Sequence, residues 1–147
     1  MKNPTDETLA IFSFNITCMF YNSNIEKFVS TAIKLRVQNL TIDLSHRDLP
    51  QILIRSKTLV FLKLKKITLK KNLSSIYLPS LKALHMESVT FSEYKYLTKI
   101  LSGCPVMEEL ETKDLMVEKN YRVSMGEAIY FSNLVRANIS GEHILYA

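Results

Sequence analysis

Apolar residues recur along the chain in one spaced pattern: an apolar residue, two further residues, a second apolar residue, one further residue and a third apolar residue. Three copies are clear, and they lie at Val37–Leu40–Ile42, Leu59–Leu62–Leu64 and Leu81–Leu84–Met86. Weaker copies lie at Ile11–Phe14–Ile16, Met107–Leu110–Thr112 and Leu134–Ala137–Ile139. The central positions follow one another at intervals of 22 to 27 residues, so the chain contains an internal repeat.

Each copy ends in an alternation of apolar and other residues, which is the pattern of a strand with one buried face. One strand cannot bury that face alone, whereas successive parallel strands can stack into a continuous apolar wall. Intervals of about 20 to 29 residues are typical of leucine-rich repeats. The pattern therefore predicts an α/β fold, a leucine-rich-repeat solenoid of five to six irregular repeats. We expect a right-handed β-α superhelix of the ribonuclease-inhibitor-like type, with parallel strands on the concave face.

The segments between the copies predict the return half of each repeat. Apolar pairs follow three copies at a similar offset, and they are Ile67 with Leu69, Val89 with Phe91, and Leu115 with Val117. Helical spacing predicts a helix capped by Asn24, with one apolar face made of Ile25, Phe28, Val29, Ala32 and Ile33. A second helix is predicted after a Ser92 cap, with an apolar face of Tyr96, Leu97, Ile100 and Leu101. Gly103 and Pro105 are placed to end it.

The composition fits one domain with a real apolar core and no cofactor. Apolar residues make up 47% of the chain and charged residues 22%. The three glycines form no phosphate-binding string, which argues against a nucleotide site. Cys18 and Cys104 have no Cys or His at metal-ligand spacing. We therefore expect no metal, and two thiols that behave as small buried hydrophobic groups.

We expect an N-terminal tail at residues 1–10 and one repeat domain at residues 11–147, incomplete at its C-terminus. The apolar stretch Leu9–Tyr21 is interrupted by Asn15 and Thr17, and acidic residues precede it. A signal peptide has a basic start, and a membrane helix has roughly 20 apolar residues. The expected protein is therefore cytoplasmic or nuclear, not secreted and not bound to a membrane.

The residues that alternate with the inward apolar positions are expected to face outward on the concave side, where solenoids bind partners. An ordinary solvated face is the competing interpretation for each of them taken alone. Phe61 is the exception, because an exposed aromatic residue on a strand is a plausible anchor for a partner. The candidate protein-binding residues are Asn39, Thr41, Asp43, Phe61, Lys63, Lys65, His85, Glu87, Glu109, Glu111, Lys113, Arg136 and Asn138.

The charge distribution raises nucleic-acid binding as an alternative. Residues 34–71 hold ten basic and two acidic residues, and the isoelectric point is near 9.2. Nucleic-acid surfaces usually interleave such charges with stacking aromatic residues and arginine, and both are scarce here. Lysines beside a strand also prevent aggregation. We therefore expect no nucleic-acid partner.

Enzyme chemistry is also not expected. The three histidines His46, His85 and His143 fall in different repeats, and no recognisable motif places a serine or cysteine nucleophile beside them. Cys104 follows Gly103 at a turn where the repeat needs a small buried residue. We therefore predict no catalytic residues, with His85 and Glu87 facing the same way on one strand.

Several segments together resemble the repeat region of plant F-box/LRR proteins, in particular those of the FBD type. The strongest are Leu78–Pro79–Ser80–Leu81–Lys82–Ala83–Leu84–His85 and the string from Leu101 to Leu110, in which Leu-Ser-Gly-Cys-Pro is the most specific part. Val89–Thr90–Phe91, residues 56–64 and residues 25–44 are similar to other parts of such repeats. The resemblance covers roughly residues 11–140.

The resemblance implies a substrate receptor of a cullin–RING ubiquitin ligase, in which F-box helices hold the ligase adaptor and the repeats hold a substrate. Only about ten residues precede the first repeat here, without a helical F-box motif, and an FBD region is missing or barely begun. We therefore expect a non-catalytic protein-interaction module whose protein partner is a substrate, and which binds the adaptor only if an F-box lies upstream. The alternative is a stand-alone repeat protein, a decoy or a fragment with no ligase association.

Overall fold

A computed structural model describes residues 13–17, 25–49, 55–70, 76–119, 133–140 and 145–146. The strands are β1 (Ser13–Thr17), β2 (Asn39–Asp48), β3 (Phe61–Leu69), β4 (Ala83–Glu87), β5 (Thr90–Glu93), β6 (Glu109–Lys113), β7 (Met116–Lys119), β8 (Arg136–Ser140) and β9 (Leu145–Tyr146). Two helices are described, α2 (Ile25–Lys34) and α3 (Tyr94–Ser102). Within these ranges, neither helix is long and apolar enough to cross a membrane.

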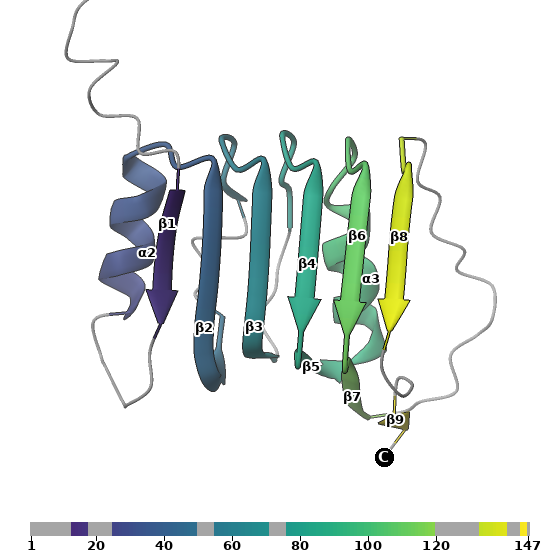
Figure 1. The fold of residues 1–147 in the computed structure, drawn as a ribbon. Helices are drawn as coiled ribbons and strands as arrows, with labels where there is room; N and C mark the ends of the chain where they lie inside the picture. Colours follow the sequence, from purple (N-terminus) through teal and green to yellow (C-terminus); the bar gives the residue numbers. More distant parts are fainter. Residues whose placement is uncertain are drawn as a thin grey trace, which may run out of the picture.

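The six strands β1, β2, β3, β4, β6 and β8 lie side by side and point the same way (Figure 1). All of these pairings are parallel, and the central position of each repeat pairs with that of the next. The register runs through Phe14, Leu40, Leu62, Leu84, Leu110 and Ala137. The sheet is open, and the prediction of a leucine-rich-repeat solenoid with parallel strands is confirmed.

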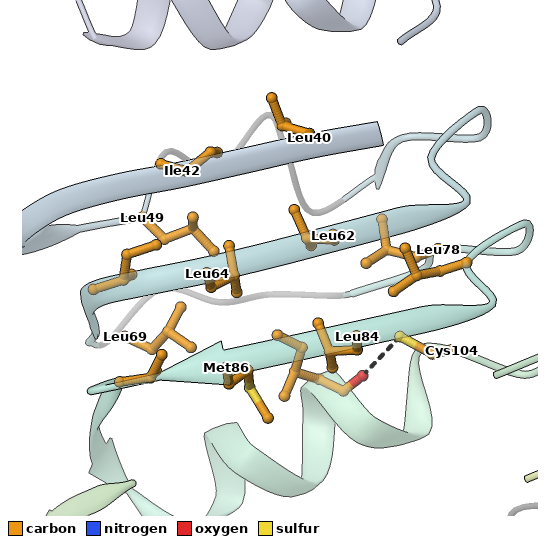
Figure 2. Packing of buried hydrophobic residues seen from close by; sticks show 14 of the residues in the cluster. Leu40, Ile42, Leu49, Leu62, Leu64, Leu69, Leu78, Leu84, Met86 and Cys104 are labelled. Carbon is orange, nitrogen blue, oxygen red and sulfur yellow. Dashed lines mark hydrogen bonds between the residues drawn. The ribbon is translucent and has the colours of Figure 1, made fainter. Parts of the chain in front are cut away.

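The core is the apolar wall that these strands share. Leu40, Leu62 and Leu84 are at most 1% exposed, and Leu110 is 5% exposed. A second buried row lies two residues further along β2, β3, β4 and β6, and Figure 2 shows parts of both rows running across adjacent strands. Burying one leucine side chain contributes about 1.5–3 kcal/mol, so these rows are the main source of stability.

After the buried rows of β3, β4 and β6, the chain passes through a residue with left-handed backbone geometry. These residues are Lys66, Ser88 and Asp114, with φ angles of 50°, 53° and 54°, which residues other than glycine rarely adopt. Each stands at the equivalent point of its repeat and leads into a second strip of strands. In that strip Leu69 pairs with Phe91 and Phe91 with Val117, as the recurring apolar pairs predicted.

Helix α2 forms where the spacing predicted it, and Val29 and Ala32 are buried in the core. The prediction that Phe28 shares this buried face is wrong, because its side chain is 46% exposed. Asn24, the predicted cap, lies outside the described residues.

The predicted Ser92 cap of the second helix is wrong. Ser92 belongs to β5, and its hydroxyl oxygen is buried without a hydrogen-bond partner in the described structure. Helix α3 begins at Tyr94, after an extended Glu93 whose side chain forms no capping bond. The strand is favoured here because Phe91, one residue earlier, fills the buried row between Leu69 and Val117.

Gly103 ends α3 as predicted, but for a different physical reason. Its φ of −78° is accessible to any residue, so a left-handed turn does not require glycine here. The requirement is space, because a β-carbon at this position would clash with the backbone carbonyl group of Ile76. The carbonyl of Gly103 also accepts a hydrogen bond of 2.8 Å from the backbone N–H of Leu78.

The last copy of the repeat departs from the expected burial. Ile139 was predicted to face the core, yet its side chain is 76% exposed, and Ala137 is exposed as well. Among the described strands, β8 pairs only with β6, so no further strand covers its other side. The apolar pattern therefore marks a position on the strand without ensuring its burial.

We predict that Gly103→Ala destabilises the protein by about 1–3 kcal/mol, because the new methyl group must push the backbone at Ile76 away from α3. The neighbouring exposed change Ser102→Ala is the control and should alter stability by no more than about 0.5 kcal/mol. Urea denaturation followed by circular dichroism measures both. Equal stability of the two variants would show that the close approach does not constrain the fold.

Candidate protein-binding face

The side chains that alternate with the buried rows lie on one surface, which we call the open face. By register it has three rows, each crossing β2, β3, β4, β6 and β8. The rows are Asn39–Phe61–Ala83–Glu109–Arg136, Thr41–Lys63–His85–Glu111–Asn138 and Asp43–Lys65–Glu87–Lys113–Ser140. The structure thus brings all thirteen candidate residues together on one surface.

Exposure differs between the middle and the edges of the open face. Residues of β3 and β4, such as Phe61, Lys63 and His85, are half-buried by their neighbours on adjacent strands. Those of β8, including Arg136 and Asn138, are exposed, as are Glu111 and Lys113 on β6. Both helices contribute buried residues to the core cluster on the opposite side of the sheet, so neither covers the open face.

His85 on β4 contacts two carboxylates of β6, and one of these also contacts β8. Its Nε2–H donates to the Glu109 carboxylate at 3.1 Å, and its Nδ1 lies 3.6 Å from Glu111. Arg136 Nη1 donates to the other oxygen of Glu109, also at 3.1 Å. The face therefore carries an ionic network from β4 through β6 to β8, at right angles to the strands.

Glu109 is held in its charged form by this network. The hydrogen bond from His85 is the main cause of its lowered pKa, and the charges of His85 and Arg136 act in the same direction. Partial burial opposes the shift by penalising the charged carboxylate. At neutral pH the Glu109 carboxylate is therefore negatively charged, and its hydrogen-bond partners are His85 and Arg136 of the same chain.

The aromatic ring of Phe61 packs against His85 from the neighbouring strand. The two ring centroids are 4.8 Å apart, and the planes meet at 74°, an edge-to-face arrangement. Such a contact is favourable and fixes the ring orientation. One face of the sheet thus has a half-buried aromatic residue beside its ionic network.

The sequence did not identify these contacts between repeats. It placed His85 and Glu87 on the same side of one strand, as they are, but the partners of His85 are Glu109 and Glu111, and Glu87 lies 3.9 Å from Lys65. Aligning the repeats by their central leucines would have revealed the pairing, because it places Glu111 directly beside His85.

Other titratable residues give no second cluster. His46 lies in β2 beyond the three rows, with a left-handed φ of 69°, and His143 is outside the described residues. No group of three or more His, Cys, Asp or Glu side chains that could hold a metal ion occurs among the described residues.

Cys104 is a buried structural thiol, as expected from the sequence. Its Sγ–H donates a hydrogen bond to the carbonyl oxygen of Ile100, with 3.2 Å between sulfur and oxygen, and Figure 2 shows this bond as a dashed line. Burial raises its pKa to about 12, so the thiol stays protonated at neutral pH. A protonated thiol is a poor nucleophile. Cys18 lies outside the described residues.

Comparisons with known proteins give one consistent family. Residues 26–126 match the family model described as FBD-associated F-box protein At5g56370, LRR repeats. The chain is 34% identical over 114 residues to the putative F-box/FBD/LRR-repeat protein At5g62970 of Arabidopsis thaliana, a match that covers 74% of this chain and 25% of that protein.

Two further relatives from Arabidopsis thaliana agree with this. The FBD-associated F-box protein At5g38590 is 38% identical over 59% of this chain and 22% of its own length. The F-box/LRR-repeat protein At1g55660 is 34% identical over 74% of this chain and 32% of its own length. The chain thus matches between about a fifth and a third of these relatives. No solved structure shows a significant match.

The lowered pKa of Glu109 predicts an acid-sensitive contribution to stability. A carboxyl whose pKa is lower in the folded state stabilises the protein above its unfolded pKa, and this contribution is lost as the pH falls through the folded value. We predict that Glu109→Gln lowers the urea midpoint near neutral pH, and that the difference from wild type closes below about pH 4.

The matched control is Glu108→Gln, an exposed neighbour that forms no ion pair in the described part of the chain. It should follow the wild-type protein at every pH. A Glu109→Gln difference that persists unchanged into acid would mean that packing, and not charge, links Glu109 to His85 and Arg136.

Proposed function

The chain belongs to the family of FBD-associated F-box proteins, through their leucine-rich repeats, and from this membership we propose that its open face binds a protein substrate of a ubiquitin ligase. The proposed role is the recognition half of a substrate receptor. The names of these relatives include F-box, the module that we expect to connect such a receptor to the ligase adaptor.

The observation that carries the proposal is the continuous open face itself. Five adjacent strands present three rows of outward side chains, and no helix of the described chain covers them. Solenoids use extended surfaces of this kind to bind partners. Phe61 at the middle supplies a rigid aromatic group, the residue type that often dominates the free energy of protein association.

A non-catalytic role fits the side chains on this face. Both ring nitrogens of His85 face carboxylates, and the residues beside it on the same row are Lys63 and Glu111. Nucleophilic catalysis needs a hydroxyl or thiol within hydrogen-bond reach of a base. The thiol of Cys104 is buried among core residues and not on this face.

Charge reversal on the open face tests this function. We predict that Lys63→Glu combined with Lys65→Glu removes most of the proteins that the tagged chain captures from a plant extract, as measured by quantitative mass spectrometry. Reversing two adjacent charges on a binding surface replaces attraction with repulsion, which typically costs several kcal/mol. Stability should change by less than about 1 kcal/mol, because only one of the two lysines forms an ion pair, the 3.9 Å contact of Lys65 with Glu87, and pairs near the surface contribute little.

The control reverses two helix lysines, Lys27→Glu with Lys95→Glu. In each pair of lysines one forms an ion pair, Lys65 with Glu87 and Lys95 with Glu93. The control should capture the same proteins as wild type. If the face variant and the helix variant capture equal amounts, substrate recognition does not use the open face.

A further inference from the structure

Lys63 is a half-buried cation without a partner in the middle row of the open face. It lies on β3 between Thr41 and His85. Its side chain forms no ion pair or hydrogen bond in the described part of the chain. Lys113 on β6 also lacks an ion-pair partner among the described residues, but its side chain is exposed to solvent. The nearest acid on the β2 side is Asp43, one row away, and its carboxylate accepts the backbone N–H of Ser45 at 3.3 Å.

The charges around Lys63 are already matched by partners within the protein. Lys65 lies 3.9 Å from Glu87, and Glu109 is bonded to both His85 and Arg136. A partner that covers β3 and β4 therefore meets one half-buried ammonium group without a counter-charge, next to charges that are already paired. Burying an unpaired charge is costly, so a stable complex needs an anionic group at Lys63.

Phe61 places an apolar contact beside this cation. The two residues are two positions apart on β3, and their side chains point to the same face. Their separation along the strand is about 7 Å, from a rise of about 3.3 Å per residue. A peptide bridges that distance with side chains one or two positions apart.

We propose that the open face recognises a peptide segment in which a carboxylate side chain lies within two residues of an apolar or aromatic one. The carboxylate pairs with Lys63 Nζ, and the apolar side chain packs on the Phe61 ring. This inference rests on the proposed function and adds the chemical class of the partner segment.

A carboxylate fits this position better than a phosphate group does. One unpaired lysine balances one negative charge, whereas phosphate carries about −1.5 to −2 and is usually held by arginine clusters. Glu87 lies on the same strand as His85, and Glu111 lies beside His85 in the row of Lys63. These two carboxylates would repel a second charge on the ligand.

A peptide selection tests the proposal without knowledge of the natural partner. The full chain is immobilised, and random twelve-residue peptides displayed on phage are selected against it. We expect enriched sequences to carry Asp or Glu within two positions of Leu, Ile, Phe, Tyr or Trp. The affinity of an enriched peptide is then measured by fluorescence anisotropy.

A double-mutant cycle connects the peptide carboxylate to Lys63. Replacing the acid by its amide in the peptide, or Lys63→Ala in the protein, should each weaken binding about tenfold, and both together no further. Lys27→Ala on α2 is the matched control and should leave the affinity unchanged. Phe61→Ala should weaken every peptide, and circular dichroism verifies that each variant is folded.

The outcomes separate this inference from the proposed function. Enriched peptides that depend on Phe61 but lack an acidic residue overturn the inference and leave the open face as the binding surface. Peptides that bind equally to wild type, Phe61→Ala and Lys63→Ala overturn both, as does a selection with no enrichment. Tighter binding when phosphoserine replaces the acid would overturn the choice of a carboxylate.

Discussion

The structure depends on one constraint: the strands β2, β3, β4 and β6 must bury the same two positions against their neighbours. A strand of this length cannot be stable alone, but Leu40, Leu62, Leu84 and Leu110 stack in register, so each buries the next. A shift by one residue would turn every buried side chain outward and every charged one inward. The apolar rows therefore fix the register across the sheet, and with it the composition of the open face.

This register is what assembles charged groups from separate repeats. His85, Glu109 and Arg136 are far apart in sequence, yet the register places Arg136 beside Glu109 and His85 diagonally across from it, within hydrogen-bond distance. The network neutralises charges that a partner would otherwise have to desolvate. The side chain of Lys63 stays half-buried and without an ion-pair partner beside the ring of Phe61, and under our proposal a peptide contacts this pair. The same rows that stabilise the fold thus determine which chemistry the surface offers.

The repeat spacing was sufficient to predict the parallel strands, the buried leucines and the set of outward residues, because a two-residue alternation has only one register that buries Leu62 and its equivalents. Of the contacts between repeats, the place of Glu111 beside His85 follows from the alignment of the repeats, whereas the hydrogen bond from His85 to Glu109 depends on side-chain geometry across strands. The prediction of a Ser92 cap was wrong because a serine before a helical pattern is equally compatible with a helix cap and with the end of a strand. Ile139 shows that a core position is buried only when a neighbouring strand covers it.

Hydrogen–deuterium exchange of the Leu84→Ala variant tests most directly whether the shared rows hold the sheet together. Removing this side chain from β4 should cost about 2–5 kcal/mol. If the strands stabilise one another, the backbone amides of β3 and β6 should lose protection together with those of β4, because both neighbours bury their leucines against it. Faster exchange confined to β4, with β3 and β6 as protected as in wild type, would contradict the account.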